Sequence, residues 1–412
     1  MLMLLLAASF FEGYDDNILA LVPIDIQDSF GLTLSQFAWM RFFIQLGAVL
    51  AFVVAASADW WGRRPILLWS IVGYTVFTGL TAFAWSVVIF TILQFCAKVF
   101  LASEYAVAVT MISEEFPPHR RGRALGIFSL MTAAGTLLVA LVALTPLMNT
   151  ALEWRVLYLV GLIPLVIMIF LRRRIEETLL FQHRRKVERA RGHKREITIW
   201  EPWRHEHRYY MIVLAIITFL RSFPVFAASA WWVWYAEREA GLPRDQILLF
   251  FMVAFALGIV GYYVCGRLID VLGRKPVLIT FALIAWVAAT LLFQTRAGII
   301  QAVCIVFAVF FGLGSAPALN AFYTELFPTR LRASAAAWAR NAFEIPGLIL
   351  GPLAVGLLGD HGTGAIGSVG DATTVVAAVL PALAILVWRY LPETKGRKLE
   401  ALDIAEQVEH DS

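Results

Sequence analysis

Long apolar stretches separated by short polar loops run through the whole chain. Uncharged runs such as 65–84, 124–148 and 276–294 are each long enough to cross a hydrocarbon core of about 30 Å as a helix rising about 1.5 Å per residue. This pattern predicts twelve helical membrane spans, at 2–22, 35–58, 65–84, 87–112, 123–146, 154–171, 209–235, 246–269, 276–294, 298–324, 333–358 and 372–391. The expected fold class is therefore an all-α membrane protein with twelve transmembrane helices in two pseudo-symmetric six-helix halves.

Charged loops between the spans repeat at a constant separation of 211 residues. The first copy consists of Asp59, Gly62, Arg63, Arg64, Glu114 and Arg121, and the second of Asp270, Gly273, Arg274, Lys275, Glu325 and Arg332. A duplicated membrane half is typical of carriers that open alternately to the two sides of a membrane.

The residue types in these loops favour a charged latch. An aspartate at a helix end can pair with an arginine across the gap, and a glycine allows a tight turn between two spans. Breaking and remaking this pair would help to decide which side of the carrier is open. The alternative is that the charges only fix the topology of the spans.

Composition excludes several other classes of protein. Hydrophobic residues make up 60% of the chain and charged residues 16%, so lipid must be the solvent for much of its surface. The net charge of +4 comes from basic residues beside the spans, which does not indicate nucleic-acid binding. Cys96, Cys265 and Cys304 lie in apolar segments, so we expect no disulfide framework and no metal or other cofactor. No cluster of a nucleophile and a base is visible, which argues against an enzyme.

Charge distribution predicts the topology. The basic loops fall on one side, which the positive-inside rule makes cytoplasmic, and twelve spans then place both termini in the cytoplasm of a plasma or inner membrane protein. The predicted parts are a first half (1–171), a basic linker (172–208), a second half (209–391) and a tail (392–412). The linker carries twelve Lys/Arg and six Glu, and it is expected to lie on anionic headgroups or, alternatively, to bind a regulator. The first span begins at Met1 without a basic segment, so it is expected to be retained, although the true start of the chain is open.

The loop at 266–275, Gly-Arg-Leu-Ile-Asp-Val-Leu-Gly-Arg-Lys, resembles the signature of the major facilitator superfamily, and its first copy departs once, at Ala55. The ending 391–396 and the loop 325–330 are similar to the branch with sugar porters, metabolite–proton symporters and aromatic-acid–proton symporters. The opening 11–15, Phe-Glu-Gly-Tyr-Asp, is similar to the acidic first-span motif of the aromatic-acid and metabolite symporters. The resemblance implies alternating access by rocking halves, with spans 1, 4, 7 and 10 lining the cavity and spans 3, 6, 9 and 12 facing lipid. A monomer is expected.

Charged residues inside the spans are the candidates for function, because each costs about 2.5–3.5 kcal/mol at mid-bilayer on insertion scales. They avoid the spans that the resemblance places against lipid. They are Glu12, Asp15, Asp16, Arg41, Lys98, Glu104, Arg221, Arg340 and Glu344.

Acidic residues in the first span are candidates for proton coupling. Glu12 and Asp15 are three residues apart and share a helix face, and Asp15 is expected to pair with Arg41. Burial and a nearby arginine act in opposite directions on a carboxyl group, so one of these acids can titrate near neutrality. The alternative is a permanent ion pair between helices. Glu104 is the third candidate.

Two cations indicate the charge of the substrate. Lys98 and Arg221 fall near mid-membrane, one in each half, without an acid four residues away, which would suit an anion. Alternatively, either cation snorkels or pairs with Glu104 or Glu12. Further substrate-binding candidates are Arg41, Tyr105, Asn320 and Arg340, although Arg340 and Glu344 are four residues apart and can neutralise each other.

These features predict a secondary transporter for proton-coupled uptake of a small organic anion, with an aromatic or other carboxylate as the favoured substrate. The partners expected are that substrate, protons and the lipid bilayer. The alternatives are uptake of a neutral solute such as a sugar, drug efflux by the same fold, or, from other classes, a sensor or a membrane enzyme.

Overall fold

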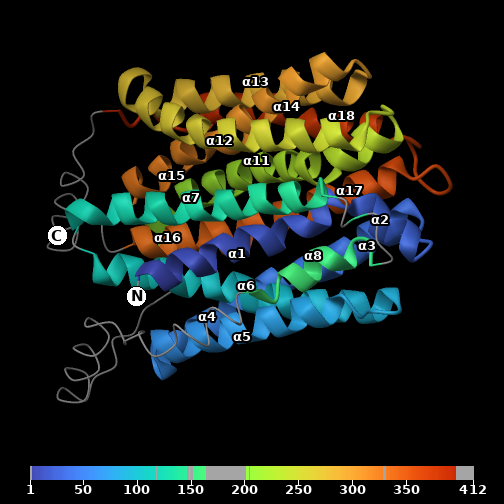
Figure 1. Cartoon of the computed structure of the whole chain (residues 1–412). Helices are drawn as coiled ribbons and strands as arrows, with labels where there is room; N and C mark the ends of the chain where they lie inside the picture. The colour runs from blue at the N-terminus through green and yellow to red at the C-terminus, as the bar shows by residue number, and fades with distance from the viewer. Residues whose placement is uncertain are drawn as a thin grey trace, which may run out of the picture. The chain divides into compact units, whose positions relative to one another are not determined.

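A computed structural model of the 412-residue chain describes residues 2–116, 118–145, 148, 152–163, 201–203, 205–327 and 331–395. The described chain is helical, and it divides into two compact units, Met1–Glu196 and Ile197–Ser412 (Figure 1). Most of the predicted linker, 172–208, and the end of the predicted tail lie outside the described residues. The boundaries predicted for these two parts therefore stay predictions.

The N-terminal unit is built from eight described helices. They are α1 (Leu2–Leu21), α2 (Pro23–Ser29), α3 (Leu34–Gln45), α4 (Gly47–Trp61), α5 (Arg63–Thr81), α6 (Val87–Glu115), α7 (Pro118–Ala143) and α8 (Arg155–Val160). Helix α1 packs on α7, and α5 and α4 pack on α6. Gly13 and Gly135 make the first of these contacts possible, because a Cβ at either position would lie under 2 Å from a backbone oxygen of the facing helix.

The C-terminal unit has longer helices and several interruptions. Its elements are the 3₁₀ turn η3 (Glu201–Trp203), α11 (His205–Arg238), α12 (Arg244–Leu272), α13 (Arg274–Gln294), α14 (Gly298–Gly312), the 3₁₀ turn η4 (Leu313–Ser315), α15 (Ala316–Glu325), α16 (Arg332–Trp338), the π-helical segment η5 (Ala339–Glu344), α17 (Ile345–Gly359), α18 (Val369–Ala377) and α19 (Val379–Tyr390). Helix α11 packs on α17, and α14 packs on α12 and α13.

Two interruptions matter for the site. The tenth predicted span, 298–324, is divided by η4 into α14 and α15, and the eleventh, 333–358, contains η5 between α16 and α17. Interrupted helices and π-helical segments free backbone carbonyls from the regular hydrogen-bonding pattern, and in membrane proteins they often mark functional sites.

Nine helices in the described part of the chain are long and apolar enough to cross a membrane. Helices α1 and α5, which correspond to the predicted spans 2–22 and 65–84, are formed but are not among these nine. Helix α1 carries three acids, Glu12, Asp15 and Asp16, which make it less apolar than the nine. The second part of the predicted sixth span 154–171, from residue 164 on, lies outside the described residues.

Candidate functional site

The second charged loop forms a compact ionic cluster in the C-terminal unit. Gly273 ends α12 and begins α13 with φ +106°, a backbone conformation that favours glycine. The next residue, Arg274, contacts Glu325 of α15 through Nε at 3.0 Å and Nη2 at 2.7 Å, and both side chains are 14% exposed. Asp270 lies 3.6 Å from Arg274 and is 72% exposed. Glu325 is therefore the principal acid of the predicted latch, and Asp270 is secondary.

Glu393, which follows α19, caps the start of α13. Its carboxylate accepts the backbone N–H groups of Arg274 and Lys275, each at 3.0 Å. Partial burial raises the pKa of Glu393. The hydrogen bonds from the backbone N–H groups of Arg274, Lys395, Lys275 and Thr394 together lower it by more than burial raises it, so the pKa lies below the ordinary value. Its position in the sequence does not by itself predict this capping role.

The first loop repeats the backbone geometry of the second. Gly62 joins α4 to α5 with φ +110°, and Arg63 Nη1 donates to the carbonyl of Ala58 at 2.9 Å. The equivalent bond runs from Arg274 Nη1 to Ile269 O at 3.0 Å. Arg64 is exposed. The side chains of Asp59, Glu114, Arg121 and Arg332 lie outside the described part, so their roles in the latch stay predictions.

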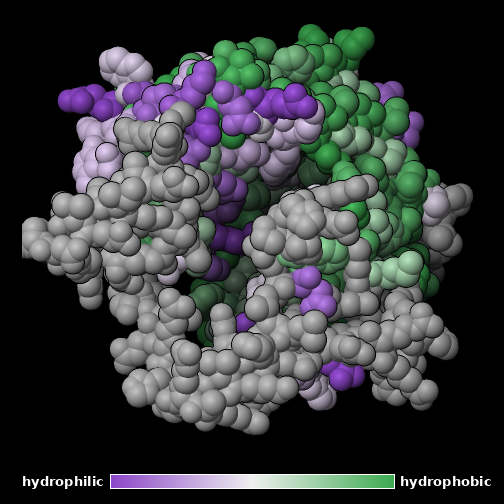
Figure 2. All heavy atoms as spheres, turned by 90° about the vertical axis from the view of Figure 1, so that its left-hand side faces the viewer, coloured by the Kyte–Doolittle hydropathy of each residue, from purple (hydrophilic) through white to green (hydrophobic). Residues whose placement is uncertain are grey.

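Figure 2 shows one face of the molecule coloured by hydropathy. Hydrophilic residues gather in part of this face, and hydrophobic residues cover the adjoining flank. This distribution fits helices whose sides meet lipid and whose ends meet water.

The mid-membrane cation of the N-terminal unit has an acidic partner. Lys98 of α6 forms an ion pair with Asp16 of α1, whose side chain is 47% exposed. Asp15, the neighbouring acid, accepts a hydrogen bond from the Thr78 hydroxyl at 3.5 Å, and its predicted pair with Arg41 stays a prediction. Arg41 donates to the carbonyl of Leu19 at 3.4 Å.

The mid-membrane cation of the C-terminal unit is held by several groups at the interrupted helices. Arg221 of α11 is 4% exposed, and its Nε donates to Ser315 Oγ at 2.7 Å. Its Nη2 donates to the carbonyls of Gly312 and Leu313 at 3.4 and 3.2 Å, where α14 gives way to η4. Its Nη1 contacts Glu344, in the π-helical segment, at 3.4 Å. One guanidinium group thus bridges both interruptions.

Lys98 and Arg221 have no acid four residues away, but each has an acidic partner on another helix, and neither partner is the predicted Glu104 or Glu12. Their partners, Asp16 and Glu344, are remote in the sequence, and no spacing rule within one helix points to them. Glu344 was expected to neutralise Arg340, and it lies against Arg221. The break that receives Arg221 does have a signal in the sequence, because Gly312, Gly314 and Ser315 interrupt an apolar run.

The other substrate-binding candidates are distributed differently. Asn320 and Arg340 are exposed side chains in the C-terminal unit. Tyr105 is half-buried, and its ring lies 5.5 Å from that of Phe128. Of the proton-coupling candidates, Glu104 is fully buried and Glu12 is half-buried.

Comparison with known proteins identifies relatives over nearly the whole chain. The family described as Major Facilitator Superfamily matches residues 4–349 and 214–406. The chain is 26% identical to a probable 4-methylmuconolactone transporter of Cupriavidus pinatubonensis, over 88% of this chain and 84% of the relative. It is 26% identical to a putative niacin/nicotinamide transporter of Bacillus subtilis, over 84% of this chain and 85% of the relative.

Solved structures show the same fold. The xylose transporter XylE from E. coli in an inward-open conformation superposes with a TM-score of 0.78 at 17% sequence identity, covering 98% of each chain. At this identity the likeness concerns the fold alone. Twelve spans are the number consistent with it.

Proposed function

The chain belongs to the major facilitator superfamily, and we propose that it takes up a small organic carboxylate together with protons. Like its relatives, it is a multi-pass membrane transporter and not an enzyme. The substrate class and the proton coupling are the proposal. The observation that carries them is that each unit holds one mid-membrane cation against one acidic side chain.

The two ion pairs can exchange partners with an anion. Lys98 is held by Asp16, and Arg221 by Glu344. Asp16 and Glu344 are 47% and 33% exposed, so both acids are reachable from outside the protein core, whereas Arg221 is buried. A substrate carboxylate that takes the place of one acid keeps the cation paired, so the displacement leaves no stranded charge.

Protons enter this exchange when an acid inside the spans is protonated. A carboxylate that binds a proton loses its attraction for the cation, and the freed cation then favours an anionic substrate. Uptake of the proton and of the carboxylate would thus be linked through one charge. The candidates for the proton are Glu12 and Asp15 of α1 and Glu104 of α6. Tyr105, Asn320, Arg41 and Arg340 remain candidates for contact with the substrate.

The names of the relatives agree with this substrate class. Niacin carries a carboxylate on an aromatic ring, and nicotinamide is its neutral amide; both appear in the name of one relative. Xylose, transported by the structural neighbour, is neutral, and neutral-solute uptake is therefore the alternative. Drug efflux has less support, because the in-span cations favour an anion.

The ionic cluster of Arg274 is proposed to control the rate of opening. Arg274 ties the start of α13 to the end of α15 through Glu325, and Glu393 ties it to the segment after α19. A rearrangement of these helix ends would have to break strong, partly buried contacts. The equivalent loop at Gly62 is expected to act in the same way in the N-terminal unit.

A ligand panel tests the substrate class directly. Purified protein in detergent is heated with niacin, with nicotinamide and with xylose, and bound ligands raise the unfolding temperature by mass action. We expect the acid to stabilise the protein and the amide to do so much less.

Loss of one charge-assisted contact costs about 1.5–3 kcal/mol, so Lys98→Gln or Arg221→Gln should weaken binding of the acid about 10- to 100-fold. Arg296→Gln, which removes an exposed cation, is the control. Equal stabilisation by acid and amide, or by xylose alone, would favour a neutral substrate.

A further inference from the structure

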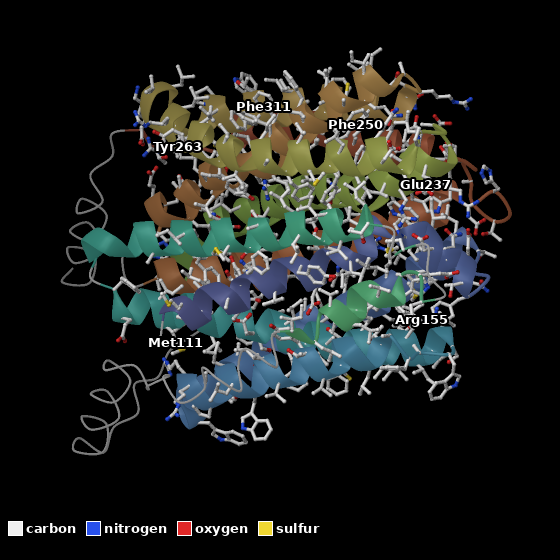
Figure 3. The ribbon with its side chains drawn as sticks, in the orientation of Figure 1. Met111, Arg155, Glu237, Phe250, Tyr263 and Phe311 are labelled. Carbon is white, nitrogen blue, oxygen red and sulfur yellow. The ribbon has the colours of Figure 1, made fainter. Side chains whose placement is uncertain are left out.

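One acidic side chain of the N-terminal unit lies in its apolar core. Glu104 of α6 is 0% exposed, and neither of its carboxyl oxygens has a hydrogen-bond partner in the described part of the chain. Leu101, Ala108 and Met111 lie on the same face of α6 and are also buried. Figure 3 labels Met111, two turns from Glu104, near one end of the unit, and Arg155 near the other. A core position that would suit leucine is thus occupied by an acid.

A tyrosine lies level with Glu104 on the neighbouring helix. Phe77 of α5 stacks on Phe100 of α6, with the ring centroids 5.9 Å apart. Tyr74 lies about one turn before Phe77, and Glu104 about one turn after Phe100. Because α5 and α6 run in opposite directions, both steps lead the same way along the pair. Tyr74 is 0% exposed, and the carboxyl group of Glu104 acts on it electrostatically.

The acids of α1 complete the surroundings. Asp15 and Glu12 also act electrostatically on Tyr74, so acids of both α1 and α6 influence this tyrosine. Asp15 Oδ1, like the oxygens of Glu104, is buried without a hydrogen-bond partner among the described residues. Three acids and one phenol thus share a small region enclosed by α1, α5 and α6.

The in-span cations of this unit are engaged elsewhere. Lys98, on the same helix as Glu104, is paired with Asp16, and Arg41 of α3 donates to the carbonyl of Leu19. Helices α4 and α7, which also pack on α6, carry charged residues only at one end, at 59 and at 119–123. An ionised Glu104 in this core would lack both hydrogen bonds and a counter-ion, which is costly.

We propose that Glu104, with Tyr74, is the site that carries the coupled proton. The inference rests on the proposed function and names its proton-binding residue. In the conformation described here the site is filled, and Glu104 is a neutral acid in an apolar core. When the site discharges, the O–H bond of Glu104 breaks and a new O–H bond forms on a carboxylate oxygen of Asp15. The Tyr74 hydroxyl then donates a hydrogen bond to the carboxylate left on Glu104.

Transport assays on Glu104→Gln test the site. Glutamine has nearly the same size but cannot release a proton, so accumulation of niacin driven by a pH gradient should be lost in proteoliposomes while counterflow of labelled niacin continues. Tyr74→Phe should keep counterflow and reduce accumulation. Glu115→Gln, at the exposed end of the same helix, is the matched control and should accumulate niacin normally. Normal accumulation by Glu104→Gln would overturn the inference.

Infrared spectroscopy tests the site without a substrate. A protonated carboxyl group has a C=O stretch separate from that of a carboxylate, and the wild type near neutral pH should show such a band that is missing in Glu104→Gln. Tyr74→Phe should shift this band, and this variant tests the site if Glu104→Gln does not fold. A wild type without the band contradicts the inference. A wild type that shows the band but transports no carboxylate contradicts only the proposed substrate class.

Discussion

Replacing Glu344 by glutamine removes the carboxylate that competes with the substrate for Arg221. The carboxylate of Glu344 contacts Arg221 Nη1 at 3.4 Å, and it is 33% exposed. The other donors of Arg221 remain engaged with Ser315 and with the carbonyls of Gly312 and Leu313. The variant therefore keeps the guanidinium in place and changes mainly the charge beside it.

The size of the effect follows from the geometry. A hydrogen bond between charged groups contributes about 1.5–3 kcal/mol and one to a neutral group about 0.5–1.5 kcal/mol. The contact is long and partly exposed, so the lower end of the first range applies, and the glutamine amide retains part of the interaction. The competing attraction should fall by about 1 kcal/mol, which corresponds to about fivefold tighter binding of the acid.

Titration calorimetry with niacin and nicotinamide measures this change. We expect Glu344→Gln to bind niacin about fivefold more tightly, with little change for nicotinamide, because only the acid competes for the charge. Asp245→Asn, which removes an exposed acid from the same unit, is the control and should bind both ligands as the wild type does. The reasoning is refuted if niacin affinity is unchanged or falls, or if both ligands gain equally.

Three further predictions concern the ionic cluster at the second loop. Glu325→Gln should lower the free energy of unfolding in detergent by about 2 kcal/mol and slow transport, because it breaks a partly buried contact with Arg274. Asp270→Asn should lower the free energy of unfolding by at most about 0.5 kcal/mol, and equal effects of the two variants would contradict this ranking. Gly273→Ala should destabilise by about 1–3 kcal/mol, because φ is +106° and the new Cβ would lie 2.7 Å from Glu393 Oε2; a melting temperature like that of the wild type would show that the turn is unstrained. Because the pKa of Glu393 is lowered in the folded protein, its stabilising contribution is present above the ordinary carboxyl pKa and is lost as the pH falls through the lowered value. Glu393→Gln should therefore make the free energy of unfolding depend less on pH in the acid range. An unchanged dependence would assign it to other groups.

Much of the fold was accessible from the sequence, because the repeat and the span lengths are local properties. The 211-residue separation predicted that Gly62 and Gly273 play the same part, and both have a positive φ. It also placed Arg63 and Arg274 in equivalent positions, and each donates to a carbonyl five residues before it. Tight turns of this kind are encoded by a few neighbouring residues, so a single sequence reveals them.

The partners of the in-span charges were not accessible in the same way. Lys98 and Asp16 are 82 residues apart, and Arg221 and Glu344 are 123 apart. Which side chains meet across two helices depends on how each helix is rotated and where the two cross, and the α-helical period alone does not fix either quantity. Sequence reasoning therefore found the charged residues but not the acids that contact Lys98 and Arg221.

Measuring proton and substrate movement together is the most direct test of proton-coupled uptake of a carboxylate. Proteoliposomes that contain the wild-type protein and a trapped pH indicator are exposed to labelled niacin or to nicotinamide without an imposed gradient. The account predicts that niacin enters with protons, so that the interior acidifies as label accumulates, and that nicotinamide produces neither signal. Entry of niacin without acidification, or equal entry of nicotinamide, would contradict proton-coupled uptake of a carboxylate.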